Sequence, residues 1–338
     1  MNTQRKRILS VLILLLCCAV FMIFRYAGGK NGAEGRYSRT GFAFDTVIDV
    51  TLYDTGDLSE EKANELLDEC MQICTHYEDL FSRTKEGSDI FRIAHAGGND
   101  VNVDPETARL LSDALSFAEE SNGLADPSIG ALSSLWFPDG PAGEVPSEEL
   151  IKEAIRHIDH RKIIVNGNTV RCEDPGIIPD LGFIAKGYAA DRLGHYLSEN
   201  GVESALINLG GNVLAIGKRP DGSEFRVGVR DPLHPDGSPI LSVPADNLSV
   251  VSSGNYERFF EKDGVRYHHI LDPETGYPAD TGLSQVTIIS SSSEEADALS
   301  TICFLLGYDR AVTFLKENHP DVRAFFVDAS GNIKEYKP

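Results

Sequence analysis

A change in the spacing of apolar residues near Lys162 constrains the fold of this chain most strongly. Before this point, the segments 59–77 and 105–121 repeat apolar residues at helical spacing, which predicts helices. After it, short runs rich in β-branched residues follow one another between turns such as the Gly167-Asn168 hairpin signal. No internal repeat or low-complexity tract interrupts the pattern. We therefore expect one α+β domain with a large mixed or antiparallel sheet and flanking helices.

The same patterns predict the positions of the individual elements. Helices are expected at 59–77, 105–121, 147–158, 182–200, 294–306 and 309–318. Strands are expected at 44–53, 163–166, 169–172, 204–209, 213–217, 226–230, 240–243, 248–252, 267–271, 284–290 and 324–327. Ser59 and Ser147 stand where N-caps of two of the helices are expected.

The N-terminus has the pattern of an export signal. Basic residues at 5–7 precede an apolar run at 8–24, and a glycine-rich linker at 25–39 leads into the folded domain at 40–338. An uncleaved signal anchor is favoured because no small-x-small cleavage site follows the run; cleavage, or lipidation at Cys17 or Cys18, is the alternative. Because the basic residues precede the run, we expect a cell-membrane protein whose folded domain lies on the extracytoplasmic side.

Charge and cysteine content exclude several classes of protein. The chain has 31 basic and 52 acidic residues and a net charge of -21, which argues against a nucleic-acid or anionic-membrane surface. A binding site for a polyanionic ligand therefore needs local positive charge or hydrogen-bond donors, such as a metal ion or backbone amides. The cysteines beyond the apolar run, at positions 70, 74, 172 and 303, are too few for a disulfide scaffold and lack metal-site spacing.

The segment from His268 to Pro278 combines a histidine pair with an Asp-Pro turn. Histidine has an unperturbed pKa near neutrality, so it can accept a proton from a hydroxyl group. Pro273, Gly276 and Pro278 force a shaped loop directly after it. By itself the segment fits an active-site loop and a solvated histidine pair beside an ordinary turn equally well.

Further candidate ligands lie on predicted helices and turns. Asp297 and Thr301 are one helical turn apart, which places two hard oxygen ligands of the kind that Mg²⁺ prefers on one face. The segment from Asp180 to Lys186 enters a helix and offers free N–H groups and a cation to an anionic ligand. Ser253-Gly254 is a turn that lets backbone approach a ligand. Each also has a purely structural interpretation, as a helix cap, a strand-to-helix junction or a simple turn.

Six motifs in a fixed order resemble the ApbE family of FAD:protein FMN transferases. They cover roughly residues 40 to 335 and are Gly123-Leu124-Ala125-Asp126-Pro127-Ser128-Ile129-Gly130, Asp180-Leu181-Gly182 with Ile184-Ala185-Lys186-Gly187-Tyr188, Asn208-Leu209-Gly210-Gly211-Asn212, Ser253-Gly254-Asn255-Tyr256, His269-Ile270-Leu271-Asp272-Pro273 with Thr275-Gly276, and Asp297-Ala298-Leu299-Ser300-Thr301.

The resemblance implies an enzyme that cleaves FAD, esterifies FMN to a threonine of an exported or membrane acceptor protein, and releases AMP. It implies that Asp297, Thr301 and the Phe183 carbonyl hold Mg²⁺, and that His269 is the base, since it stands three residues before Asp272. It also implies an FAD-binding site made of Phe44, Thr84, the turn Leu124, Ala125 and Asp126, Asp180, Lys186, Ser253, Gly254 and Leu271.

Some positions depart from the family pattern on the side of the flavin ring. Phe44-Asp45-Thr46 replaces a usual Met-Gly-Thr, and Thr84 stands where an aromatic residue often follows the first helix. These departures imply altered flavin packing with the metal-binding residues retained. Two alternatives stay open on the sequence: an FAD pyrophosphatase that uses water in place of threonine, and a flavin-binding protein without activity.

Overall fold

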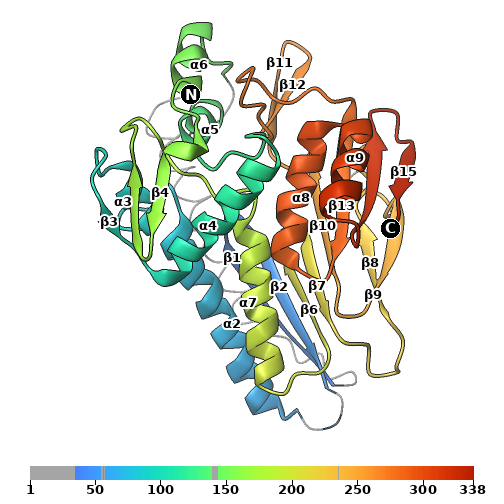
Figure 1. Cartoon of the computed structure of the whole chain (residues 1–338). Coiled ribbons are helices and arrows are strands. Elements are labelled where there is room, and N and C mark those ends of the chain that lie inside the picture. The colour runs from blue at the N-terminus through green and yellow to red at the C-terminus, as the bar shows by residue number, and fades with distance from the viewer. Residues whose placement is uncertain (1–34, 55, 57, 139–143, 235) are drawn as a thin grey trace, which may run out of the picture.

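The computed structural model describes residues 35–54, 56, 58–138, 144–234 and 236–338, and an eight-stranded sheet organises them (Figure 1). The strand order is β1-β2-β6-β7-β10-β13-β14-β15, and every neighbouring pair is antiparallel. The sheet is therefore antiparallel throughout and not mixed. Its strands are β1 (Arg36–Ala43), β2 (Thr46–Tyr53), β6 (Ala205–Leu209), β7 (Asn212–Ile216), β10 (Ser249–Gly254), β13 (Leu283–Ser290), β14 (Arg323–Asp328) and β15 (Ile333–Tyr336).

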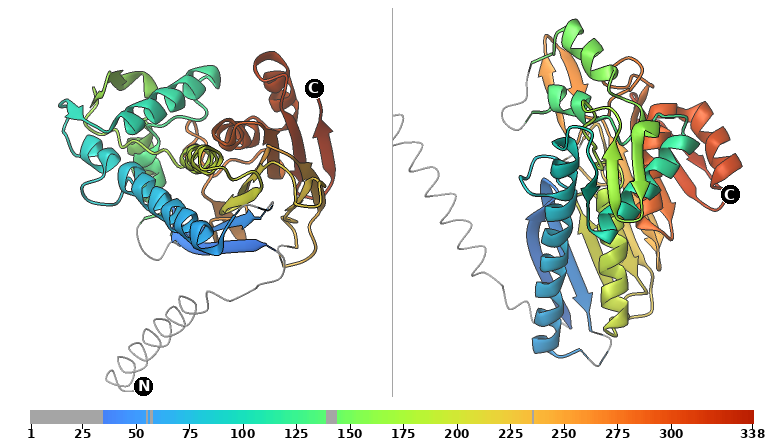
Figure 2. Two further views of the ribbon diagram at one scale, coloured as in Figure 1. Left: turned by 90° about the horizontal axis from the view of Figure 1, so that it is seen from below. Right: turned by 60° about the vertical axis from the view of Figure 1, so that its left-hand side comes forward.

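Helices cover one face of this sheet (Figures 1 and 2). They are α2 (Glu60–Phe81), α7 (Ala185–Glu199) and α8 (Ser293–Leu306), with α9 (Tyr308–Asn318) packed on α8. Ser59 caps α2 as expected, because its hydroxyl accepts a hydrogen bond from the Lys62 N–H. The apolar side chains of these helices and of the covered sheet face are almost fully buried and form the two largest core clusters.

A close contact between α7 and α8 depends on one glycine. A Cβ atom at Gly187 would lie 2.3 Å from the Ser293 carbonyl oxygen and 2.7 Å from the Asp297 Cβ. Only glycine permits this approach, which brings the Asp297 carboxylate to the first turn of α7. The packing of two helices thus places a residue of the predicted metal site.

Smaller units flank the main sheet. A three-stranded sheet, β3 (Val101–Asn102), β5 (Thr169–Cys172) and β4 (Ile163–Asn166), accompanies α3 (Asp89–Ala94), α4 (Pro105–Glu120), α5 (Gly130–Trp136), α6 (Glu148–Ile155) and the 3₁₀ turn His160–Lys162. The hairpin β8 (Phe225–Val229) and β9 (Leu241–Ala245) packs its apolar side chains on the sheet face opposite the helices. The hairpin β11 (Phe259–Lys262) and β12 (Val265–His268) completes the described fold.

Most predicted elements are present, with corrections at several boundaries. The strand predicted at 267–271 ends at His268, because His269 and the residues after it bond to loops instead of a neighbouring strand. The helix predicted from 182 begins at Ala185. Local periodicity missed β1, β3, β11, β15, α3 and α5, which are short or start where a linker is expected; β1 begins at Arg36, inside the range 25–39.

The predicted membrane segment at 8–24 lies outside the described residues. Among the residues that the structure does describe, no helix combines the length and apolar character needed to cross a bilayer.

Candidate functional site

A cavity of about 780 Å³ lies where the main sheet, the first turn of α7 and the loops around α5 meet. Most of the site residues predicted from the sequence line it: Phe44, Thr84, Leu124, Ala125, Asp126, Asp180, Phe183, Lys186, His269, Leu271 and Thr301. Ser253 and Gly254, which were predicted as a turn, instead end strand β10, and they and Asp297 lie behind this wall. The Ser253 hydroxyl forms hydrogen bonds with the hydroxyls of Ser300 (2.7 Å) and Thr301 (3.3 Å). Segments far apart in the sequence therefore meet in one place.

The two adjacent histidines have different environments. His268 is 6% exposed, its Nε2 lies 3.1 Å from the Ala279 carbonyl oxygen, and its ring packs edge-on against Phe304. His269 is half-buried and lines the cavity. Its Nδ1 lies 3.2 Å from the Arg258 carbonyl oxygen, which can only accept a hydrogen bond. That contact places the proton of a neutral His269 ring on Nδ1 and leaves Nε2 as the acceptor.

Electrostatics favour the neutral form of His269. Burial lowers the pKa of His269 to about 3, and the positive charge of Arg258 acts in the same direction. The pKa of His268 is lowered to about 4, again mainly by burial. At neutral pH both rings are uncharged, but only His269 can accept a proton from a molecule in the cavity.

The loop after His269 is held by a remote tryptophan. Within the loop, the Gly276 N–H donates to the Asp272 carbonyl oxygen (2.8 Å) and the Asp272 N–H donates to the Tyr277 carbonyl oxygen (2.9 Å). Trp136 of α5 is fully buried and donates its indole N–H to the Gly276 carbonyl oxygen (2.8 Å). The Asp-Pro turn is thus a rigid loop, as its proline and glycine residues predict.

Asp297 is a buried carboxylate with one strong and one weak partner. It is 2% exposed; its Oδ2 accepts the Gly187 N–H at 2.9 Å, and its Oδ1 lies 3.4 Å from the Lys186 Nζ. Burial raises the pKa of Asp297, although Lys186 and the Gly187 amide oppose the rise. Oδ1 therefore lacks the close partners that a buried charge normally has. Its nearest charged neighbour is Lys186, which lines the cavity.

Asp180 and Arg83 form a second charged pair in the wall. The Arg83 Nε lies 3.5 Å from the Asp180 Oδ2, while the Asp180 Oδ1 accepts the Gly182 N–H at 2.9 Å. Each side chain is less than a fifth exposed, at 18% and 19%. This pair fixes the loop that precedes α7, and with it the Phe183 backbone and Lys186.

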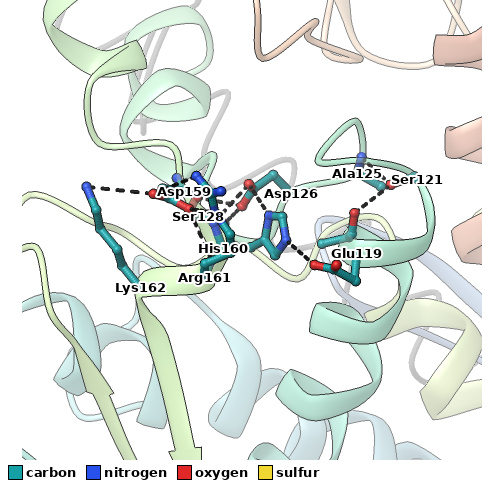
Figure 3. A network of polar contacts seen from close by, with 10 residues as sticks. Glu119, Ser121, Ala125, Asp126, Ser128, Asp159, His160, Arg161 and Lys162 are labelled. Atoms are coloured by element: carbon teal, nitrogen blue, oxygen red, sulfur yellow. Dashed lines mark hydrogen bonds and ion pairs between the residues drawn. The ribbon is translucent and has the colours of Figure 1, made fainter.

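The Asp126 carboxylate is used by the protein itself (Figure 3). Its Oδ1 accepts hydrogen bonds from the Ser128 N–H (2.8 Å) and hydroxyl (2.5 Å). Its Oδ2 accepts the His160 N–H (3.0 Å) and lies 3.0 Å from the His160 Nδ1. His160 in turn reaches Glu119 at 3.3 Å. With four partners and 4% exposure, Asp126 shapes the Leu124–Asp126 turn, and its carboxylate oxygens are already satisfied.

The turn between β1 and β2 is strained and lines the cavity. Phe44 and Asp45 have φ angles of +54° and +57°, values that favour glycine or asparagine. The Phe44 N–H donates to the Glu78 Oε1 of α2 (2.8 Å), and Asp45 pairs with Arg258 at 3.6 Å. Thr84, which also lines the cavity, contacts Ser82 at 3.3 Å.

Sequence reasoning missed several residues of the cavity. Arg258 supports His269 through its carbonyl group, Glu78 holds the strained turn, and Arg83 pairs with Asp180. Glu257 lines the cavity, and its side chain is accessible to solvent within it. The surrounding protein reduces the hydration of its carboxylate, which raises the pKa of Glu257 to about 7. The only available signal was the position of Glu257 and Arg258 directly after Ser253-Gly254-Asn255-Tyr256.

Known proteins with similar sequences point to the same family as the six motifs. A sequence model of the ApbE family matches residues 44–326, which include every predicted site residue. The chain belongs to the ApbE family. The FAD:protein FMN transferase of Treponema pallidum (strain Nichols) is 36% identical over 338 residues, covering 94% of this chain and 90% of the relative. That of Klebsiella pneumoniae (strain 342) is 37% identical over 265 residues, covering 78% and 82%.

The fold agrees with solved ApbE structures. The crystal structure of the ApbE protein from Thermotoga maritima superposes with a TM-score of 0.80 at 34% sequence identity, covering 88% of this chain and 96% of the other. The ApbE family model begins at residue 44, so β1 lies before the matched region. All residues that line the cavity lie within the part of the chain that the family model matches.

Proposed function

We propose that this ApbE protein transfers FMN from FAD to a threonine hydroxyl of an acceptor protein and releases AMP. One observation carries the proposal: a neutral histidine with a free Nε2 lines the cavity, and a buried, incompletely satisfied carboxylate lies behind the cavity wall beside Lys186. The first is a proton acceptor, and the second is the feature of a site for a hard cation. The names of the T. pallidum and K. pneumoniae relatives support FAD as donor and a protein as acceptor.

The residues present fit Mg²⁺. Asp297 offers the Oδ1 atom, Thr301 follows one helical turn later with its hydroxyl, and Phe183 adds a backbone carbonyl in the loop before α7. All three ligands are oxygen atoms, and a single carboxylate leaves room for phosphate oxygens in the coordination shell. A bound Mg²⁺ supplies stabilisation of the negative charge that develops on the pyrophosphate.

The residues of the chain carry the proton and the charge in this reaction. The threonine Oγ forms a bond to the phosphorus of the FMN part, and the bond from that phosphorus to the bridging oxygen breaks, so that AMP leaves with this oxygen. The hydroxyl proton passes to the His269 Nε2. Lys186, at 25% exposure beside Asp297, is placed to contact the phosphates.

We further propose that the enzyme acts outside the cytoplasm, held at the membrane by residues 8–24. The basic residues at 5–7, the apolar run and the glycine-rich segment after it support this placement. The acceptor is then an exported or membrane protein. Protease accessibility of the folded domain in intact cells tests the placement: a domain protected until the cells are lysed would refute it.

Incubation with FAD, Mg²⁺ and an acceptor tests the activity. Covalent flavin on a threonine of the acceptor, found by mass spectrometry together with an equal amount of AMP, is the expected result. Release of FMN and AMP without labelling would instead indicate the pyrophosphatase, with water as nucleophile. Bound but unchanged FAD would exclude both reactions. His269→Ala serves as the matched negative control.

A further inference from the structure

The cavity extends beyond the residues predicted for FAD, across the sheet face opposite α2. Its floor there consists of side chains from neighbouring strands: Val47 and Asp49 of β2, Asn208 of β6, Val213 of β7 and Val250 of β10. The registers Asp49–Asn208, Asn208–Val213 and Val213–Val250 make most of this floor one cross-strand row. The end of β8, residues 227–230, forms one wall. We call this part of the cavity the open-face groove.

The outer end of the open-face groove is apolar. Phe42 and Val47 are direct cross-strand partners at the β1–β2 hairpin, and they are 64% and 57% exposed. They are the most exposed large apolar side chains in the described part of the chain. Val47 lines the cavity and Phe42 is beside it on the same face, so the apolar pair leads directly into the groove. Contiguous exposed apolar residues at the rim of a site indicate contact with a partner molecule.

The part of the groove next to β8 carries a cation, Arg230. Arg230 follows β8 and lines the cavity, yet it forms no ion pair with another residue in the parts of the chain that the structure describes. The neighbouring Asp231 is occupied by the turn after it, where it accepts the Leu233 N–H at 2.8 Å and contacts His234. Arg230 also acts on Glu257, as does Lys186, so the groove adjoins the reacting centre.

Glycines leave the groove floor open to a polypeptide backbone. Gly211 has a φ of +97°, and a Cβ atom placed there would contact nothing within 4 Å. Gly228 lies in the β8 wall. The negative charge of Asp49 is partly met within the sheet, because it accepts hydrogen bonds from Thr40 (2.8 Å) and Thr51 (3.3 Å). A bound polypeptide in an extended conformation can therefore pass Gly211 in the open-face groove without meeting a bulky side chain.

We propose that the open-face groove binds the acceptor polypeptide as an extended segment around its target threonine. This inference rests on the proposed function, because the acceptor must then cross the cavity rim for its hydroxyl to reach His269. Phe42 and Val47 contact an apolar side chain of this segment, and Arg230 pairs with a carboxylate on the other side of the threonine. The groove is thus the acceptor site of the enzyme, next to the FAD site and distinct from it.

Short peptides test the proposal, since recognition of an extended segment needs no folded acceptor. The full chain, with FAD and Mg²⁺, is given a pool of synthetic 12-residue peptides, each with one central threonine and with Asp, Ala or Lys at flanking positions. Mass spectrometry then counts the FMN-labelled peptides. We expect labelling, with peptides that contain aspartate preferred over those that contain lysine. Labelling of a folded acceptor protein but of no peptide would overturn the proposal.

Matched variants separate the groove from the FAD site. Phe42→Ser and Arg230→Ala should each raise the KM for a labelled peptide about tenfold and leave the Kd for FAD unchanged. The controls are Ile333→Ser, which replaces an exposed apolar residue on β15 at the other edge of the sheet, and Arg226→Ala, which removes an exposed arginine of β8 that does not line the cavity. A higher Kd for FAD in Arg230→Ala would assign the groove to FAD and refute our assignment. Release of FMN and AMP with neither the peptides nor a folded acceptor protein labelled would instead refute transfer itself.

Discussion

Replacement of Asp297 by asparagine should stabilise the metal-free protein while it abolishes activity. In the folded protein, Asp297 is 2% exposed, and its ionised form has the Gly187 amide at 2.9 Å and Lys186 at 3.4 Å as partners. Burial nevertheless raises the pKa of Asp297, so the loss of hydration outweighs both attractions. An asparagine keeps an oxygen for the Gly187 N–H and removes the buried charge.

The sign of the effect follows from proton linkage. Because the pKa of Asp297 in the folded protein is raised above the ordinary value of 3.8, folding favours the protonated carboxyl. Wild-type stability relative to Asp297→Asn therefore falls as the pH rises from near 3.8 through the raised pKa, and the deficit is complete above it. Single stabilising substitutions commonly add about 0.5–2 kcal/mol to the free energy of unfolding, and we expect a gain in this range for Asp297→Asn. For a large domain, each kcal/mol corresponds to roughly 2–4 °C in Tm.

Mg²⁺ should reverse the order of stability, so that wild type becomes more stable than Asp297→Asn. Ligand binding to the folded state alone adds about 2.7 kcal/mol at a concentration one hundred times the Kd. Wild type is expected to gain this stability from MgCl₂ and Asp297→Asn is not, so the two Tm values should cross in a Mg²⁺ titration.

Differential scanning calorimetry with EDTA and with MgCl₂, at pH 5 and pH 8, measures both effects, and a flavin transfer assay confirms the loss of turnover. If Asp297→Asn melts below wild type in EDTA at pH 8, the argument that desolvation dominates at Asp297 is wrong. Equal stabilisation of both proteins by MgCl₂ would place the metal elsewhere.

Other substitutions separate the roles of neighbouring residues. His269→Ala should lower transfer by about 10²–10⁴-fold with little change in the Kd for FAD, because only the proton acceptor is lost; flavin transfer and fluorescence titration measure the two quantities, and a loss confined to FAD binding would contradict a role as base. His268→Ala should cost about 1–3 kcal/mol in chemical unfolding, because its buried contacts are lost, and leave the kcat unchanged; a kcat as low as that of the His269 variant would show that the two roles have been confused. Glu78→Ala should raise the KM for FAD, since the N–H of Phe44 in the strained turn loses its partner, whereas Glu78→Gln keeps an acceptor and should behave as wild type; equal effects in steady-state kinetics would exclude this explanation. Asp126→Ala should lower the free energy of unfolding by at least about 1–3 kcal/mol, because four hydrogen bonds are lost and buried donors are left without an acceptor. A urea titration that shows a change below about 0.5 kcal/mol would contradict the network in Figure 3.

Local sequence patterns determined the elements and the motifs of this ApbE protein. The strands at 163–166 and 169–172 were predicted with their observed bounds, and Ser59 and Ser147 cap the helices that they precede. These features depend on residues only a few positions apart, through backbone propensity, turn chemistry and capping. The order of the six motifs likewise indicates the ApbE family.

The availability of each side chain depended on partners that are distant in sequence. Asp126 was predicted as part of the turn that binds FAD, and this turn lines the cavity; the Asp126 carboxylate itself is held by Ser128 and by His160, which comes from a separate segment. The helix spacing indicated Asp297 as a ligand; only the contact at Gly187 shows why its carboxylate reaches the first turn of α7.

The tertiary structure also decided the difference between the two histidines and the existence of the groove. The Arg258 carbonyl leaves the Nε2 of His269 free, whereas the ring of His268 is buried against Phe304. The open-face groove exists only because four strands and β8 come together. Propensity acts along the chain, but desolvation and hydrogen-bond satisfaction are properties of the packed molecule, which is why the sequence determined the candidate residues and packing determined which atoms are available for chemistry.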